Sequence, residues 1–215
     1  MDELPEPWPL WGLELRTPRL TLRPDEDAGV GELMAEALRG IHPPAEMPFA
    51  FPWTDKEPLT MVREGFQHHW ATRAAWRPEA WEVHFLVRLD GQVIGVQSVS
   101  AKDFATLRQI GSGSWLGMRF QGEGIGTEMR AAILMFAFDQ LGARTARSEA
   151  FLDNPKSAAV SRKLGYAPDG TEVLTRRGAA AVQQRLLVTP ESFVRPDWKL
   201  EVEGLAEALP MFGLA

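Results

Sequence analysis

A glycine-rich segment carries the clearest chemical signal in this chain of 215 residues. It reads Gln121-Gly122-Glu123-Gly124-Ile125-Gly126-Thr127 and lies between a strand-like apolar run and an amphipathic helical pattern. Glycine lets the main chain approach a ligand closely, and a helix N-terminus presents unpaired N–H groups to an anion. The segment therefore predicts a binding site for a phosphate-bearing molecule.

Spacing disfavours two well-known phosphate motifs, and with them a nucleotide-dependent enzyme. A P-loop needs a lysine before its Ser or Thr, whereas Gly126 precedes Thr127 here. Counted from Gly122 or from Gly124, the last position of G-x-G-x-x-G is not glycine. The pattern that fits is Q-x-x-G-x-G, formed by Gln121, Gly124 and Gly126.

Two more segments complete a family pattern. Asn154 and Ser157 are followed by Lys163-Leu164-Gly165-Tyr166, and Thr17-Pro18-Arg19-Leu20-Thr21-Leu22-Arg23-Pro24 stands near the start. Together with the glycine-rich segment, they resemble the GNAT superfamily of acetyl-coenzyme A-dependent N-acetyltransferases. The segment near the start resembles the opening strand of the Rim-type branch, whose members acetylate ribosomal-protein N-termini and various small amines.

The resemblance implies an α/β (α+β) fold. Its central sheet would be mixed, mostly antiparallel and twisted, with about seven strands flanked by helices and a splay between strands four and five. The implied reaction moves an acetyl group from acetyl-coenzyme A to a primary amine by direct attack in a ternary complex. The acceptor would be a protein N-terminus or a small-molecule amine. The implied cofactor contacts are Leu116, Gly117, Met118, Gln121, Gly122, Glu123, Gly124, Ile125, Gly126, Thr127, Asn154 and Ser157.

The reaction needs a base, because an amine attacks only when it is neutral. Glu149 lies five residues before Asn154, where the resemblance implies a glutamate, and strand alternation places it on the face opposite Ser148. A solvent-facing strand glutamate is the alternative reading of this residue. Glu82 and His84, on one face of a neighbouring strand, are rival candidates for the base.

Two positions depart from the pattern of the family. Ser161 stands where many relatives carry a tyrosine that protonates the leaving thiolate, so Ser161, Ser157 or water would donate a hydrogen bond there. The strand before Trp115 also lacks the usual glutamate and tyrosine, and Ser114 takes the place of the tyrosine. A non-catalytic acetyl-coenzyme A-binding sensor or structural module is therefore the alternative function.

The acceptor site is expected beside a proline- and aromatic-rich segment at 42–55, which cannot form a regular helix. The residues expected to contact the acceptor are Glu82, His84, Ser114 and Trp53.

Composition narrows the class of protein. The absence of cysteine excludes disulfides, thiolate metal sites and a cysteine nucleophile, and no metal is expected. A net charge of −6 without a basic block argues against binding to nucleic acid. No apolar run approaches the ~20 residues of a membrane span. The N-terminus is unlike a signal peptide, so the cytoplasm is the expected location.

The elements that position these residues follow from hydrophobic periodicity and turn signals. An extension at 1–12 precedes the acetyltransferase domain at 13–195, and a tail with a short helix follows at 196–215. The apolar tail and the last strands could pair between two copies of the chain, so a homodimer is one of the assemblies considered. Helices are expected at 28–39, 57–76, 127–141 and 155–163, and strands at 14–23, 80–89, 92–100, 107–117, 144–152, 171–177 and 180–189.

Overall fold

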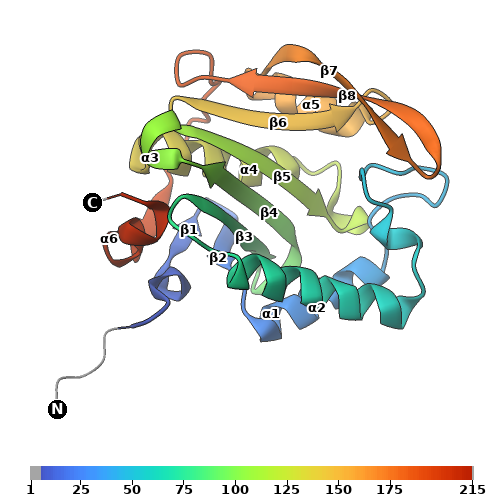
Figure 1. Cartoon of the computed structure of the whole chain (residues 1–215), viewed down its shortest axis with the longest axis horizontal. Helices are drawn as coiled ribbons and strands as arrows, with labels where there is room; N and C mark the ends of the chain where they lie inside the picture. Colours follow the sequence, from blue (N-terminus) through green and yellow to red (C-terminus); the bar gives the residue numbers. More distant parts are fainter. Residues whose placement is uncertain (1–5, 215) are drawn as a thin grey trace.

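A single mixed sheet forms the centre of the computed structural model, which describes residues 6–214 (Figure 1). The strand order is β7-β8-β6-β5-β4-β3-β2-β1-β9. Every described strand pair is antiparallel except β5 with β6. The strands are β1 Glu14–Arg16, β2 Leu20–Pro24, β3 Ala80–Leu89, β4 Gln92–Lys102, β5 Gln109–Leu116, β6 Thr145–Phe151, β7 Ala167–Arg176, β8 Ala179–Val188 and β9 Glu201–Glu203.

The expected fold class is confirmed, but the sheet has nine strands rather than about seven. Two features account for the difference. The predicted strand at 14–23 divides into β1 and β2 around Pro18, where the N–H of Thr17 bonds the carbonyl of Leu20 in a tight turn. The tail, expected to form only a helix, adds β9 beside β1 before its short helical turns.

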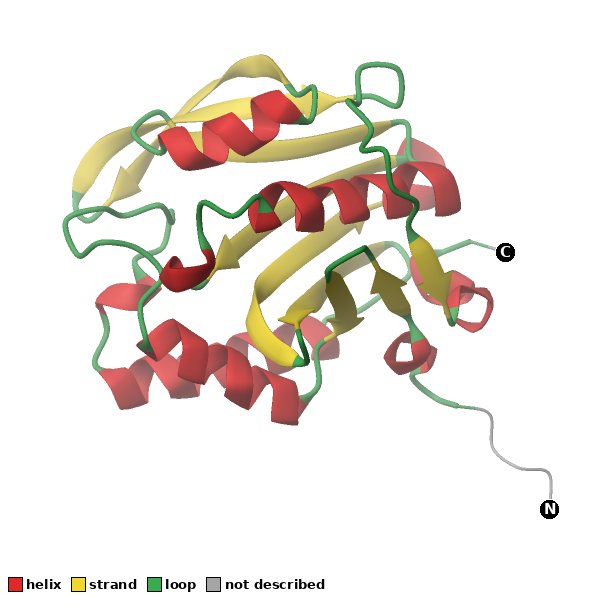
Figure 2. Ribbon diagram, turned by 180° about the vertical axis from the view of Figure 1, so that it is seen from behind, coloured by secondary structure: helices red, strands yellow, loops and turns green. Residues whose placement is uncertain are grey.

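Helices cover both faces of the sheet (Figure 2). The helix pair α1 and α2 packs beside β3 and β4, while α4 and α5 lie on the opposite face. The helices are α1 Asp27–Leu38, α2 Pro58–Ala74, α3 Phe104–Leu107, α4 Ile125–Met135, α5 Pro155–Lys163 and α6 Leu205–Ala208, with short 3-10 turns η1 Pro9–Gly12, η2 Trp53–Asp55, η3 Met118–Phe120 and η5 Leu209–Phe212 and a π-helical turn η4 Phe136–Gln140.

The main hydrophobic core lies between the sheet and α4. Phe85 of β3 meets Phe136, which follows α4, with ring centroids 5.9 Å apart. Leu10 from the expected extension and Phe212 from the expected tail are both buried in this core. Both terminal segments therefore help to stabilise the sheet that carries the site.

Strands β5 and β6 diverge, as the resemblance implied for the fourth and fifth predicted strands. Their parallel pairing runs only from Gln109 with Thr145 to Gly111 with Arg147. Beyond Gly111, β5 is paired with β4 alone. One edge of β5 is thereby left without a partner strand.

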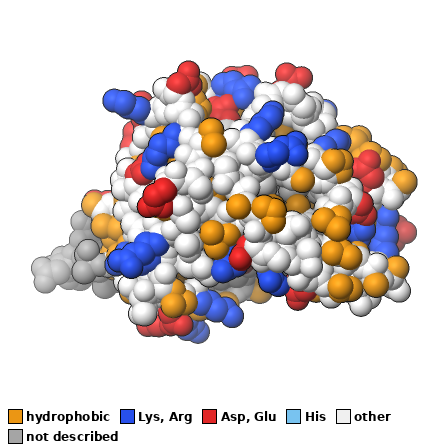
Figure 3. All heavy atoms as spheres, turned by 90° about the horizontal axis from the view of Figure 1, so that it is seen from above, with side chains coloured by type: hydrophobic (Ala, Val, Ile, Leu, Met, Phe, Trp, Pro, Cys, Tyr) orange, Lys and Arg blue, Asp and Glu red, His pale blue; other side chains and the backbone are white. Residues whose placement is uncertain are grey.

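The surface seen from above mixes charges of both signs, and hydrophobic side chains gather toward one end (Figure 3). Among the described residues, no helix has the length and apolar character needed to cross a bilayer.

Candidate active site

The divergence of β5 and β6 opens a cleft with a volume of about 550 Å³. The glycine-rich segment forms one wall, α5 forms another, and β5 and β6 line the bottom. Residues of the segment from Ile41 to Phe49 also line the cleft. Three regions that are distant in sequence therefore meet around one space.

Five consecutive main-chain amides of the glycine-rich segment are free. Those of Gly122 through Gly126 donate no hydrogen bond to the described chain, whereas the amides of Gln121 and Thr127 bond the carbonyls of Met118 and Gly124. Gly124 precedes α4 in the left-handed region, with φ of +79°, where glycine is favoured. Free amides at the start of a helix attract a phosphate group.

The side chain of Gln121 holds the cleft together from within. Its Nε2 donates to the carbonyls of Ile41 at 2.7 Å and Leu116 at 2.9 Å. Its Oε1 accepts from Lys156 Nζ at 3.2 Å. Gln121 therefore positions the loop and α5, and brings a lysine to the edge of the cleft.

The segment near the N-terminus that completed the family pattern anchors the glycine-rich segment. Glu128, in the first turn of α4, accepts from Thr17 Oγ1 at 2.6 Å and from Arg19 Nε at 2.7 Å. Arg19 Nη1 also donates to the carbonyl of Glu123 at 3.1 Å. These bonds fix the direction in which the free amides point.

The free edge of β5 presents main-chain donors to the gap. The N–H of Gly117 bonds the carbonyl of Ile94 in β4, and the carbonyl of Gly113 also points toward β4. Because successive residues of a strand alternate, the N–H groups of Ser114 and Leu116 face the gap. Leu116, Gly117 and Met118 were expected to contact the cofactor here. Leu116 and Met118 line the cleft. The amides of Gly117 and Met118 are hydrogen-bonded within the chain.

Asn154 acts first as a helix cap. Its Oδ1 accepts from the N–H of Ser157 at 3.1 Å and so begins α5. Both residues line the cleft, as expected for contacts with a cofactor.

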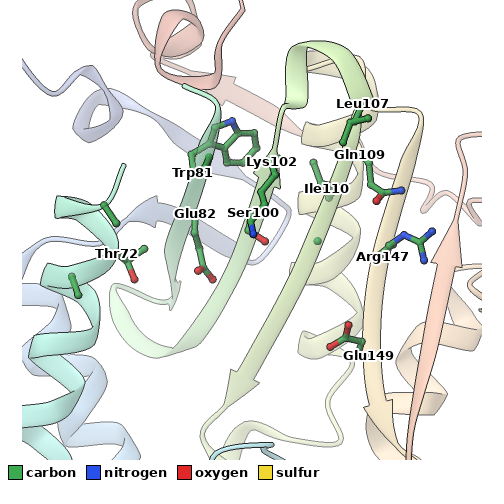
Figure 4. A pocket seen from close by; sticks show the side chains of 15 residues that line it. Thr72, Trp81, Glu82, Ser100, Lys102, Leu107, Gln109, Ile110, Arg147 and Glu149 are labelled. Atoms are coloured by element: carbon green, nitrogen blue, oxygen red, sulfur yellow. The ribbon is translucent and has the colours of Figure 1, made fainter. Parts of the chain in front are cut away.

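A second cavity of about 760 Å³ lies beside α2, on the face of the sheet opposite α4 and α5 (Figure 4). Glu82 from β3 and Glu149 from β6 extend into it. Of the described residues, Glu149 alone lines both cavities. The expectation that Glu149 and Ser148 occupy opposite faces is confirmed, since Ser148 is buried and Glu149 is exposed.

Glu82 and His84, the rival candidates for the base, belong to a cluster of histidines. Glu82 Oε1 lies 3.3 Å from Nε2 of the buried His84, whose ring packs against His69, and His69 Nδ1 lies 2.8 Å from Asp25 Oδ2. Burial alone would raise the pKa of Glu82, but the hydrogen bond from His84 and the nearby imidazoles hold that pKa below its ordinary value. A lowered pKa makes Glu82 a weaker base than an unperturbed glutamate.

His84 lines neither cavity. With Asp25 and His69 it places three possible metal-binding atoms within 4.8 Å of one another, so the expected absence of a metal stays a prediction.

Two other expected residues are not brought to the cleft. Ser161 is 1% exposed and lies behind the cleft wall, where its Oγ accepts from Arg130 Nη1 at 3.0 Å. Trp53 packs between Phe49 and Trp115, at centroid distances of 5.3 and 5.8 Å, and lines neither cavity. Ser114 does line the cleft and accepts from Arg130 Nη2 at 3.1 Å.

Arg130 is the residue that the sequence analysis missed. It lies on α4 with its side chain buried and borders the cleft. The signal was present, because Arg130 falls four residues after Gly126 and three before Ile133, on the face of the helix that must be apolar.

The comparisons with known proteins agree with this architecture. Residues 19–167 match the acetyltransferase (GNAT) domain family. The fold is similar to the RimL ribosomal L7/L12 alpha-N-protein acetyltransferase in complex with coenzyme A, with a TM-score of 0.65 at 18% identity over 82% of this chain and 97% of that one. It is also similar to Mycobacterium smegmatis RimJ in complex with CoA-disulfide, with a TM-score of 0.67 at 19% identity over 94% and 95% of the two chains. A third similar structure is the microcin C7 self immunity acetyltransferase MccE in complex with acetyl-CoA and AMP, with a TM-score of 0.60 at 20% identity over 80% and 93%.

The match covers more than half of the chain, so this protein belongs to the GNAT family of acetyltransferases. Its fold is shared with acetyltransferases of the Rim type.

Proposed function

We propose that this protein transfers the acetyl group of acetyl-coenzyme A directly to a primary amine while both substrates are bound. The observation that carries the proposal is the position of Glu149, which borders both the cleft and the cavity on the opposite face. A group placed there can serve a donor on one side and an acceptor on the other.

The donor half of the site fits a coenzyme A thioester. The free amides of Gly122 through Gly126 and the start of α4 would hold the diphosphate. The unpaired edge of β5 offers the N–H groups of Ser114 and Leu116 to the pantetheine and to the thioester carbonyl. Lys156 adds a positive charge at the edge of the cleft.

The acceptor half is the second cavity, beside α2. Gly111, at a position where the resemblance implies a glutamate, lines this cavity without a side chain. Glu82 and Glu149 offer carboxylates to an amine, which arrives as a cation at neutral pH. Lys102 and Arg147 also line the cavity, and Arg147 is paired with Asp169. A protein N-terminus and a small-molecule amine both satisfy these requirements.

The reaction would run in one displacement. Glu149, directly or through water, accepts a proton from the amine, and the amine nitrogen forms a bond to the thioester carbonyl carbon. The carbon–sulfur bond then breaks, and its electron pair leaves with the sulfur as the thiolate of coenzyme A. A free α-amine, with a pKa of roughly 7.7–8.0, needs less assistance than a lysine with a pKa of about 10.4.

Two measurements test this proposal. Acetyl-coenzyme A is titrated into the protein by calorimetry, and release of free thiol is then followed with spermidine, with a peptide that has a free N-terminus, and with the same peptide N-acetylated. Because the protein contains no cysteine, every thiol detected belongs to coenzyme A. We expect binding, and release that requires a free amine.

Binding without release for any amine in a broad panel would instead support the non-catalytic module. Failure to bind acetyl-coenzyme A would contradict both functions.

A further inference from the structure

The guanidinium of Arg130 is a buried charge without an ionic partner in the part of the chain that the structure describes. Its side chain projects from α4 toward β5 and α5 and is 5% exposed. Its two hydrogen-bond partners, Ser114 Oγ at 3.1 Å and Ser161 Oγ at 3.0 Å, are neutral hydroxyls. Its Nε has no partner among the described residues.

No nearby group of the described chain supplies a compensating negative charge. Among the described residues, Tyr166 is the ionisable group that acts on the pKa of Arg130, and burial raises the pKa of that phenol above its ordinary value, so Tyr166 is neutral at pH 7. Burial lowers the pKa of Arg130, but a guanidinium is not deprotonated in proteins, so Arg130 remains charged. A buried cation is normally paired, because its removal from water is unfavourable. Arg130 is therefore arranged for an anion that the chain itself does not contain.

The position of Arg130 indicates which anion this is. Arg130 borders the cleft, and Ser114, to which it is bonded, lies on the part of β5 that has separated from β6. Arg130 is also one helical turn beyond Gly126, the last of the free amides. Its main chain therefore lies about 6 Å farther along α4 than that amide. A cofactor whose diphosphate binds those amides would extend its thioester arm into the cleft that Arg130 borders.

Both bonded serines, Ser114 and Ser161, stand at positions where the resemblance to the GNAT superfamily implies a tyrosine. Two small side chains leave space, and the Arg130 guanidinium reaches both of their hydroxyls. The position that usually holds a weak acid is thereby served by a permanent cation.

We propose that Arg130 stabilises the thiolate of coenzyme A as the carbon–sulfur bond breaks. The sulfur leaves with the bonding electron pair, and its negative charge develops beside the guanidinium. No proton has to be delivered in that step, and the amine proton leaves through Glu149 or water. Preorganised positive charge at the point where an anion forms lowers the barrier of such a reaction. This inference rests on the proposed acetyl transfer.

The ionisation of bound coenzyme A tests the proposal without an acceptor amine. The ultraviolet absorbance of the thiolate is followed against pH in the complex with coenzyme A, and the absence of cysteine leaves one thiol to titrate. An opposite charge within a few ångströms lowers a pKa by about 1–3 units, so we expect the bound thiol to ionise that far below its ordinary value of about 8.5. In Arg130→Gln the thiol should return to that ordinary value, and Arg130→Lys should retain part of the shift.

A matched control removes the same charge nearby. Arg162 is the exposed neighbour of Ser161 on α5 and does not line the cleft, so Arg162→Gln should leave the thiol pKa unchanged. Desulfo-coenzyme A supplies a second comparison, because above the thiol pKa the parent should prefer coenzyme A over the desulfo form and Arg130→Gln should not. Thermal melting of each variant confirms that it is folded.

The outcomes separate this inference from the proposed function. If the parent binds no coenzyme A, the proposed function fails first. If coenzyme A binds and the thiol pKa is the same in the parent and in Arg130→Gln, the assignment of Arg130 to the thiolate is overturned while acetyl transfer stands. An Arg130-dependent preference for succinyl-coenzyme A over acetyl-coenzyme A, without a thiol shift, would also overturn it and assign the guanidinium to a carboxylate on the acyl chain.

Discussion

Substitution of Glu149 by glutamine probes the reaction most directly. The change keeps the size of the side chain and removes its negative charge together with its ability to accept a proton. Glu149 is exposed on β6 and faces the second cavity, beside α2, so the amide can be solvated and the fold should be unaffected. Cofactor affinity should change little, because the free amides of Gly122 through Gly126 are untouched.

The expected loss of rate follows from the surroundings of Glu149. A positioned general base contributes roughly 10²- to 10⁴-fold to a rate. Glu149 is open to water, which can take over part of its role, so we expect a fall near the lower end, about 100-fold at pH 7. About one tenth of an α-amine with a pKa near 8 is neutral at pH 7. The loss should therefore shrink as the pH rises and the neutral amine becomes abundant.

Thiol release with a peptide acceptor, measured from pH 6 to 9, gives the readout. Glu82→Gln tests the rival base, and Glu172→Gln, an exposed glutamate on β7 that lines neither cavity, is the matched control. A rate for Glu149→Gln equal to that of the Glu172 control would refute the assignment. A large loss in Glu82→Gln alone would move the base to β3.

Three further predictions concern cofactor binding, the cap of α5 and the ion pairs of α1. Gly124→Val places a side chain beside the free amides at φ of +79° and should weaken coenzyme A binding by about tenfold or more, equivalent to 1.4 kcal/mol, whereas Gly178→Val at φ of +76° in the β7–β8 turn should leave calorimetric affinity unchanged. Asn154→Ala removes the cap of α5 and should cost about 1 kcal/mol of unfolding free energy in urea titrations. Burial would raise the pKa of Glu36, but hydrogen bonds from Arg119 and Arg39 hold that pKa below its ordinary value. The stabilisation by Glu36 is therefore present at neutral pH and is lost as the pH falls below about 4.3. Glu36→Gln should accordingly cost about 1 kcal/mol at pH 7, since its partners are half exposed, and should show a smaller further loss than the parent at pH 3.

Local patterns predicted the parts of the site that depend on main-chain geometry. The run of glycines ahead of an amphipathic stretch indicated a turn and a helix start, and Gly124 does precede α4. The period of two along β6 placed Glu149 and Ser148 on opposite faces before any tertiary contact was known. Such features are set by neighbours in sequence.

The features that were missed depend on contacts between distant segments. Ser161 was expected in the cleft, but whether a helix residue faces a cavity depends on what packs against the helix, and Arg130 fills that space. Trp53 was expected at the acceptor, yet it packs with Phe49 and Trp115 against a small core of Ala37, Ile41 and Met61. Strand β9 pairs with β1 across most of the chain length, and three residues carry too short a pattern to predict that pairing.

The arrangement of side chains also bears on whether the acetyl group first passes to the enzyme. A covalent intermediate needs a nucleophile with a base in reach. The chain has no cysteine, and Ser148 lies on the opposite face of β6 from Glu149. Ser112 and Ser157 line the cleft, but no carboxylate or imidazole of the described residues is hydrogen-bonded to their hydroxyls. Ser114 and Ser161 are bonded to Arg130, which is always protonated and so cannot accept a proton from either hydroxyl. Because the two cavities meet at a carboxylate that both can reach, direct attack by the amine needs fewer groups than a relay through the enzyme.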